Sequence, residues 1–348
     1  MQVTATAKVK IQPTSEIIET IKTYSQGLQY CVDTAWEMKI KNNIKLHYIV
    51  YPYLRNIGLH SKLAIACIKQ VLGIVKIGKT KSVIKKDCVR YNFPRSASVK
   101  NNVLSLATNK GRIKMPFTVP ACYQGYFNNL DWQVKESLLY LDKQGRCFFL
   151  FTFSKHVEPV KTGKSLGIDL GINNLAVTSN NIFYKSSATK QVKRKFRYLR
   201  SRLQAKGTRA SKNLLRKISG REKRFMAWIN HNISKQIVSA SQGSKIVMEN
   251  LKGIRKINRG KTINYWISNW SFYQLQSFIR YKAERLGIEV ISVNPIYTSQ
   301  ICHRCGHKGS RSKGMFNCNH CGLSNYNSDL NASRNLAHPK LVERQGCL

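Results

Sequence analysis

One carboxylate inside an apolar segment constrains the fold of this chain more than any other feature. Asp169 lies between Ile168 and Leu170, within the sequence LGIDLGINNLAV of residues 166–177. Short apolar runs bounded by glycine are typical of buried strands, so this segment predicts a β-hairpin. Burying an unpaired carboxylate costs several kcal/mol. Asp169 must therefore either cap a turn or have a partner or a cation.

Two further acids occupy similar places in the C-terminal half. Glu249 stands near the end of the apolar run 245–251, which predicts another strand, and Asp329 stands where a helix is expected to begin. An Asp at a helix start is commonly a cap, and that interpretation of Asp329 stays open at this point. Because the chain has only 16 Asp and Glu, three such acids favour convergence. Together they predict a site for one or two Mg²⁺ ions acting on a phosphodiester. Gly167 and Gly171, beside Asp169, are expected to let metal and phosphate approach the strand.

The excess of positive charge points to a polyanionic partner. The 348 residues include 59 Lys and Arg, giving a formal net charge of +43. Self-repulsion on that scale opposes folding, so nucleic acid is the expected partner. Residues 190–224 carry 15 Lys and Arg against one acid, Glu222, with apolar residues at helical spacing. A solvated helix face usually mixes both signs, so this segment predicts phosphate contact. Around the clustered cysteines, Arg304 and Arg311 are further candidates. The candidate contacts within the basic segment are Lys193, Arg194, Lys195, Arg197, Arg200, Arg202, Arg209, Lys212, Arg216 and Lys217.

Four cysteines form two Cys-x-x-Cys pairs that are separated by twelve residues. Two such pairs can hold one Zn²⁺ tetrahedrally, and four thiolates leave no open position on the metal. The sequence therefore predicts a structural zinc site. Three nearby histidines, His303, His307 and His320, are alternative ligands. The cysteines are Cys302, Cys305, Cys318 and Cys321.

The other six cysteines are scattered singly, and we expect them to be reduced and mostly buried. No run of 18 apolar residues predicts a membrane span, and the start MQVTATAKVK lacks the apolar stretch of a signal peptide. These features together favour a cytoplasmic protein. The six are Cys31, Cys67, Cys88, Cys122, Cys147 and Cys347.

The periodicity of apolar residues changes twice along the chain. Residues 2–11 alternate as a strand, two helical stretches begin near residues 15 and 59, and residues 82–154 predict antiparallel hairpins. This pattern favours a barrel-like domain with helices inserted after its first strand. A linker is expected at 158–164, and the strands and long helices after it predict an α/β domain.

Several sequences in the C-terminal half resemble those of the transposon-encoded TnpB family, the presumed ancestor of the type V CRISPR effectors. They are GIDLGINNLAVTS, IVMENL, NPIYTSQICHRCGHKGSR and FNCNHCGLSNYNSDLNASRNLA. The resemblance covers residues 165–337 closely and residues 1–160 only in layout. Ser328 stands where many members of the family have Ala, a departure that leaves the three acids intact.

The resemblance implies a domain plan and a chemistry. Residues 1–160 would form a wedge β-barrel with a helical recognition lobe inserted at about 14–80. Residues 161–348 would form an RNase H-like, RuvC-type nuclease domain of α/β class with a zinc-binding insertion at about 299–324. Asp169, Glu249 and Asp329 stand where the family has its catalytic triad. The four clustered cysteines match its zinc ligands, and the partners would be a guide RNA (ωRNA or reRNA) and double-stranded target DNA.

The sequence therefore predicts an RNA-guided DNA endonuclease whose carboxylates bind Mg²⁺ and activate water. Asn331, one helical turn beyond Asp329, is a further candidate for hydrogen bonding in the site. Two alternatives stay open. One is a protein-only strand transferase, although no helix-turn-helix is apparent. The other is a guided repressor that does not cut, against which the three intact acids argue.

Overall fold

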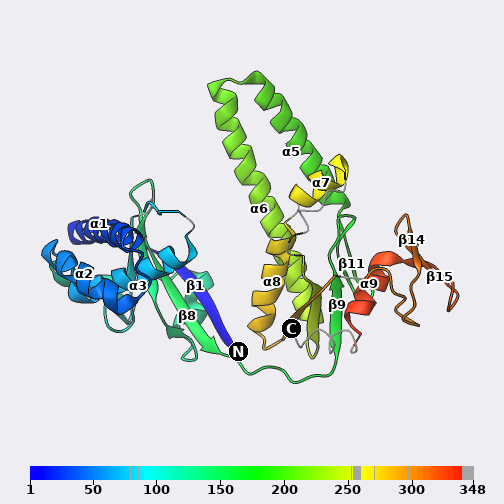
Figure 1. The fold of residues 1–348 in the computed structure, drawn as a ribbon, viewed down its shortest axis with the longest axis horizontal. Coiled ribbons are helices and arrows are strands. Elements are labelled where there is room, and N and C mark those ends of the chain that lie inside the picture. The colour runs from blue at the N-terminus through cyan, green and yellow to red at the C-terminus, as the bar shows by residue number, and fades with distance from the viewer. Residues whose placement is uncertain are drawn as a thin grey trace. The chain divides into compact units, whose positions relative to one another are not determined.

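The chain forms two units, one of residues Gln2–His156 and the other of Met1 with Val157–Leu348. The computed structural model describes residues 1–78, 80–84, 87–251, 253, 260–269, 271–295 and 298–338. Among these residues no helix is long and apolar enough to cross a membrane. The elements of both units are labelled in Figure 1.

The first unit combines two antiparallel sheets with three long helices. Its elements are β1 (Gln2–Ile11), α1 (Ser15–Glu37), α2 (Asn43–Asn56), α3 (Ser61–Ile77), β2 (Cys88–Tyr91), β3 (Ala97–Lys100), β4 (Val103–Thr108), β5 (Gly111–Pro116), η1 (Ala121–Tyr123), α4 (Gln124–Phe127), β6 (Gln133–Val134), β7 (Ser137–Leu141) and β8 (Cys147–His156).

The predicted strand at residues 2–11 is confirmed, and its alternation decides what it buries. Every second residue of β1, from Val3 to Ile11, is buried, and β1 pairs along its whole length with β8. One sheet has the order β1-β8-β7-β2, with β6 also paired to β8, and β3-β4-β5 form another sheet. The described strands thus make two sheets over a shared core instead of one closed barrel.

Helix α2 was not predicted, and its sequence explains why. Pro52 lies inside it, and only Leu46, Val50 and Leu54 are buried, one residue per turn. Outward-facing Ile44 and Tyr48 blur the apolar stripe from which a helix is usually predicted.

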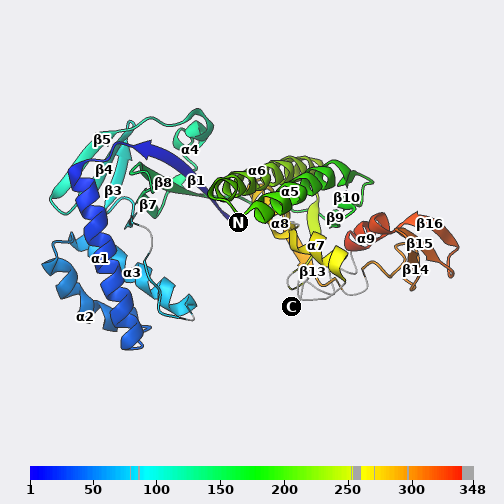
Figure 2. The ribbon, with the colours of Figure 1, turned by 90° about the horizontal axis from the view of Figure 1, so that it is seen from above.

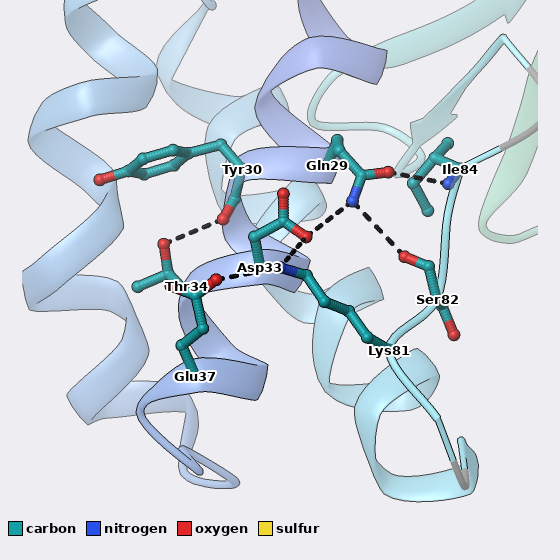
Figure 3. Close-up of polar contacts among 8 residues, drawn as sticks. All are labelled: Gln29, Tyr30, Asp33, Thr34, Glu37, Lys81, Ser82 and Ile84. Carbon is teal, nitrogen blue, oxygen red and sulfur yellow. Dashed lines mark hydrogen bonds and ion pairs between the residues drawn. The ribbon is translucent and has the colours of Figure 1, made fainter.

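A polar network fixes the chain to α1 where it leaves α3 (Figure 3). The Gln29 amide oxygen accepts a hydrogen bond from the Ile84 backbone N–H at 2.8 Å, and its nitrogen donates to Asp33. Lys81 pairs with both Asp33 and Glu37, at 3.2 and 2.9 Å. These contacts hold the crossing segment against α1 before β2 begins.

The second unit has one mixed sheet, long helices and a small sheet that carries the cysteines. Its elements are β9 (Ser165–Asp169), β10 (Asn174–Thr178), β11 (Phe183–Lys185), α5 (Ser187–Lys206), α6 (Arg209–Ala240), β12 (Lys245–Glu249), α7 (Lys261–Asn269), α8 (Phe272–Glu284), β13 (Val290–Val293), β14 (Ser310–Ser312), β15 (Met315–Cys318), β16 (Leu323–Asn327) and α9 (Ser328–Leu336).

The mixed sheet has the order β11-β10-β9-β12-β13. The pairs β11–β10 and β10–β9 are antiparallel, whereas β9–β12 and β12–β13 are parallel. Helices α6 and α8 cover one face through a core that includes Ile168, Ile246 and Met248. Helix α9 covers the other face (Figure 1), and there Leu336 packs against Val247.

The predicted basic segment folds as two helices that lie side by side, α5 and α6 (Figures 1 and 2). Gly207 ends α5 with a φ of 64°, a left-handed conformation that glycine adopts without strain. The helix expected over residues 266–286 is also two helices, α7 and α8, and residue 270 lies outside the described residues.

Candidate active site

Strand alternation carries two of the three predicted acids to the same face of the mixed sheet. Val247 of β12 is level with Gly167 of the parallel strand β9. Two residues further along each strand come Glu249 and Asp169, which therefore face the same side as Val247 and Gly167. That side is the one covered by α9. Because parallel strands end at the same edge of a sheet, both acids lie at one edge.

Gly167 lets α9 approach the sheet unusually closely. A Cβ atom at this position would lie 2.0 Å from the Ser333 carbonyl oxygen and 2.6 Å from the Ala337 backbone nitrogen. Only glycine fits without moving the helix. The expectation that Gly167 makes room for metal and phosphate is thus wrong, because the helix backbone fills that space.

The first turn of α9 brings in Asp329. Asn327 caps this helix, its side chain accepting the backbone N–H groups of residues 329 and 330 at 3.0 Å each. The alternative that Asp329 is the cap is therefore wrong. Its carboxylate instead accepts hydrogen bonds from the Asn174 amide at 2.9 Å and the Arg311 guanidinium at 3.0 Å.

The three acids line one cavity of about 750 Å³. Burial raises the pKa of Asp169 well above its usual value, and the charges of Glu249 and Asp329 raise it further while Arg311 opposes them. Burial also raises the pKa of Glu249, opposed by the Thr298 hydroxyl, which donates to its carboxylate, and by Arg311. Negative charge is thus costly at this edge of the sheet, and a cation would relieve the cost.

The donor set fits Mg²⁺, which prefers carboxylate oxygens and keeps several waters. The three carboxylates are not drawn into a tight cluster. Within the described part of the chain, the groups of three or more ligand atoms lying within 4.8 Å of one another come from cysteine and histidine alone. Asp329 is paired with Arg311 instead. The three acids therefore line the same cavity without forming a compact cluster of ligands.

The four clustered cysteines do form a tight group. Cys302 and Cys321 have sulfur atoms 3.6 Å apart, and those of Cys305 and Cys318 are 3.5 Å apart. Zn–S bonds of about 2.3 Å in a tetrahedron separate sulfurs by about 3.8 Å, so these distances fit zinc, whereas a disulfide would need about 2 Å. The structure thus brings together a cluster able to hold a metal ion.

The histidines differ in their surroundings. The rings of His307 and His320 stack with centroids 3.5 Å apart, and with Cys305 they form a second possible ligand group. His303 lies elsewhere, with its ring nitrogen Nδ1 3.0 Å from the Asn331 side-chain oxygen.

Asn331 does not lie in the cavity. It is fully buried, its oxygen accepts the His303 backbone N–H at 3.0 Å, and its amide donates to the Ile301 carbonyl at 2.7 Å. Asn335, one turn on, donates to the carbonyls of Thr298 and Ile301. The prediction that Asn331 bonds within the active site is therefore wrong, because both residues fasten the chain before the cysteines to α9.

Most candidate phosphate contacts are exposed, but two on α5, Lys193 and Arg200, are not. Lys193 is buried, with its amine 3.8 Å from Glu222, and Arg200 also pairs with Glu222. These side chains hold the two helices together, so Lys193 is not available to a phosphate in this structure. Arg311 is partly exposed but pairs with Asp329. The exposed candidates are Arg194, Lys195, Arg197, Arg202, Arg209, Lys212, Arg216, Lys217 and Arg304.

Of the single cysteines, Cys31, Cys67 and Cys147 are buried as predicted, Cys88 is partly exposed and Cys122 is exposed. Cys347 lies outside the described residues. Sequence reasoning missed two groups that bond to the acids of the cavity, the Thr298 hydroxyl, which donates to Glu249, and the Asn174 amide, which donates to Asp329. Both residues stand in sequences quoted above, Asn174 in GIDLGINNLAVTS and Thr298 in NPIYTSQICHRCGHKGSR, but nothing distinguished either from its neighbours there.

Replacing Cys318 with Ser is expected to remove zinc and unfold the small sheet, because structural zinc sites supply folding energy directly. Metal analysis should give close to one zinc per wild-type chain and almost none for the variant, with loss of amide protection in β14–β16. Cys122→Ser, which changes an exposed thiol in the other unit, is the matched control. Zinc lost from His307→Ala but retained by Cys318→Ser would contradict the four-cysteine assignment.

Two family models match parts of the chain, "Probable transposase" (OrfB_IS605) over residues 148–256 and "Cas12f1-like, TNB domain" over residues 272–336. TnpB-like protein MJ0751 of Methanocaldococcus jannaschii is 39% identical over 130 residues, covering 36% of this chain and 46% of that protein. Over these parts of its length, the chain is similar to proteins of the TnpB family. CRISPR-associated endodeoxyribonuclease Cas12f1 of Sulfoacidibacillus thermotolerans is 32% identical over 239 residues, covering 61% of this chain and 54% of that protein.

The predicted family resemblance is thus confirmed. The chain spans about half the length of the curated relatives it matches. Among solved structures, the mini-RNA-guided endonuclease CRISPR-Cas_phi3 aligns with a TM-score of 0.57 at 10% identity, covering 97% of this chain and 93% of that one. The chain therefore shares the fold of that structure.

Proposed function

We propose that this chain is an RNA-guided DNA endonuclease with an RNase H-like, RuvC-type active site. The convergence of Asp169, Glu249 and Asp329 on one cavity carries the proposal. Cas12f1 relatives described as endodeoxyribonucleases support a nuclease function. The order of strands, three antiparallel followed by two parallel, agrees with an RNase H-like sheet.

In this proposal the second unit, from residue 157, is the nuclease domain, with the cysteine sheet as a zinc-binding insertion. The first unit is a wedge domain with α1–α3 as its recognition lobe. The exposed Lys and Arg side chains of α5 and α6 would bind the phosphates of guide RNA and target DNA. Base pairing to the guide would select the sequence to be cut.

The residues around the cavity would have different roles in cleavage. Mg²⁺ bound by the three carboxylates would supply water activation and stabilise the leaving oxygen. The Thr298 hydroxyl fixes the carboxylate of Glu249, and the Asn174 amide fixes that of Asp329. Arg311, which already offsets the negative charge of the acids, would donate to the non-bridging oxygens of the phosphate.

The direct test is to sequence the RNA that copurifies with the protein and then to change the guide portion of that RNA. With Mg²⁺, we expect cleavage of the DNA that matches each new guide, and none without RNA. Cleavage that ignores the RNA would favour a protein-only strand transferase. Guided binding without cleavage would favour a repressor.

A further inference from the structure

The cavity that holds the three acids has a second, apolar wall formed by α7. Ile263, Trp266 and Ile267 line it, and their spacing of three and four residues puts them on one face of the helix. Ile267 is buried, Ile263 is 44% exposed and Trp266 is partly exposed. An indole ring at the wall of this cavity is open to a flat apolar group.

Contacts from α5 hold this wall in place. The Lys190 amine lies 5.7 Å from the centroid of the Trp266 ring and donates to the Asn173 side-chain oxygen at 2.7 Å. One residue earlier on α7, Tyr265 lies beneath the Arg197 guanidinium, which is 4.3 Å from the ring centroid. Such cation–π contacts orient both rings and set a cationic amine over the indole ring. Lys190 and Asn173 also line the cavity.

The two walls match the two parts of a nucleotide. Phosphate suits the side of the cavity with Lys190, Arg311 and the acid–metal site, whereas a nucleobase suits the indole face, since aromatic rings stack on any base. A volume of about 750 Å³ lies within the roughly 300–1,000 Å³ typical of small-ligand pockets, so a nucleotide-sized group has room. A base inside a duplex is already stacked between its neighbours and would have to leave the helix to reach Trp266.

We propose that Trp266 is a stacking platform for a nucleobase next to the phosphate to be cut, with Lys190 binding the adjacent backbone phosphate. The cavity would thereby select a strand whose bases are unpaired. This inference rests on the proposed nuclease function, because it takes the acids as the place of cleavage. Trp266 would be a positioning residue that aligns the strand with the acids.

The test places the fluorescent base 2-aminopurine at successive positions of a short single-stranded DNA oligonucleotide. Every protein variant also carries Asp169→Asn, so that the strand stays intact. Stacking on an indole quenches 2-aminopurine, and we expect strong quenching at one position. Trp266→Ala should abolish that quenching and weaken binding about tenfold, while Trp266→Phe should retain most of the affinity. Trp228→Ala, which removes a tryptophan that is 59% exposed on α6, is the matched control.

An abasic site at the quenched position gives a second comparison. It should weaken binding to the protein with Trp266 about as much as Trp266→Ala does, and it should add nothing to that variant. Unchanged quenching and affinity in Trp266→Ala would overturn the stacking platform. Because the readout is binding by a cleavage-deficient protein, this result is independent of whether guided cleavage is observed.

Discussion

Asp169→Asn is expected to lower the rate of guided cleavage by on the order of 10³-fold while leaving guide and target binding unchanged. The substitution keeps the shape of the side chain but removes the charge that would hold Mg²⁺, and losing one member of an electrostatic constellation typically costs this much. Cleavage and binding of the same labelled target, measured side by side, provide the check.

The same substitution should stabilise the folded protein at neutral pH. Burial and the two neighbouring acids raise the pKa of Asp169 in the folded state, so its ionised form opposes folding. The penalty is absent at low pH, where the carboxyl is protonated in both states. It grows as pH rises from the unfolded pKa through the raised folded one. In metal-free buffer, the free energy of unfolding of Asp169→Asn should exceed that of the wild type increasingly over this window.

Glu289→Gln is the matched control for both measurements. Glu289 pairs with Lys245 at 3.0 Å and is half exposed, at the opposite end of the parallel strands from Asp169. The Glu289→Gln substitution should change neither the cleavage rate nor the pH profile of stability appreciably. Undiminished cleavage by a pure preparation of Asp169→Asn would contradict the proposed mechanism, and a lower stability at neutral pH would contradict the electrostatic account.

Gly167→Ala is expected to disrupt the site without touching an acid. The added methyl group would meet the backbone of α9 at 2.0 Å, and backbone cannot yield as the end of a flexible side chain can. The helix must move away from β9 and carry Asp329 with it. Overpacking of this kind costs about 1–3 kcal/mol or more, and we expect a loss at the upper end of that range. Denaturant unfolding and cleavage below the unfolding transition test the two effects separately.

The control is Gly163→Ala, in the same unit. An added Cβ at Gly163 has no neighbour within 4 Å, and its backbone does not require glycine. It should leave both stability and cleavage near wild type. A Gly167→Ala protein as stable and as active as this control would show that α9 can withdraw without cost.

A structural feature of this protein could be predicted from the sequence when it depends on residues that are close together along the chain. Strand β1 and the two hairpins were predictable because alternation and turn residues are visible in one short window. The positions of the three acids were also visible, and the structure brings them to one cavity, although their catalytic role stays a prediction.

What escaped prediction depends on contacts between distant segments. Thr298 bonds to Glu249 across 49 residues, and Asn174 to Asp329 across 155, with no pattern that links them. In the sequence, nothing distinguishes Lys193 from the other lysines of its basic segment. It differs from them only in the folded structure, where α6 packs against α5 and brings Glu222 beside it. Likewise, nothing local to Gly167 indicates that a helix from the far end of the chain will lie against it.

The junction between β16 and α9 has a consequence for how the chain can change in length. The strand ends at Asn327 and the helix begins at Ser328, with no residue between them. One residue inserted there would turn every later side chain by about 100° around the helix axis. Asp329 would then point away from β9 while the cysteines kept their place. Lengthening or shortening the chain at this joint would change how Asp329 is oriented relative to the cysteine cluster, so we expect this part of the molecule to tolerate substitution more readily than insertion.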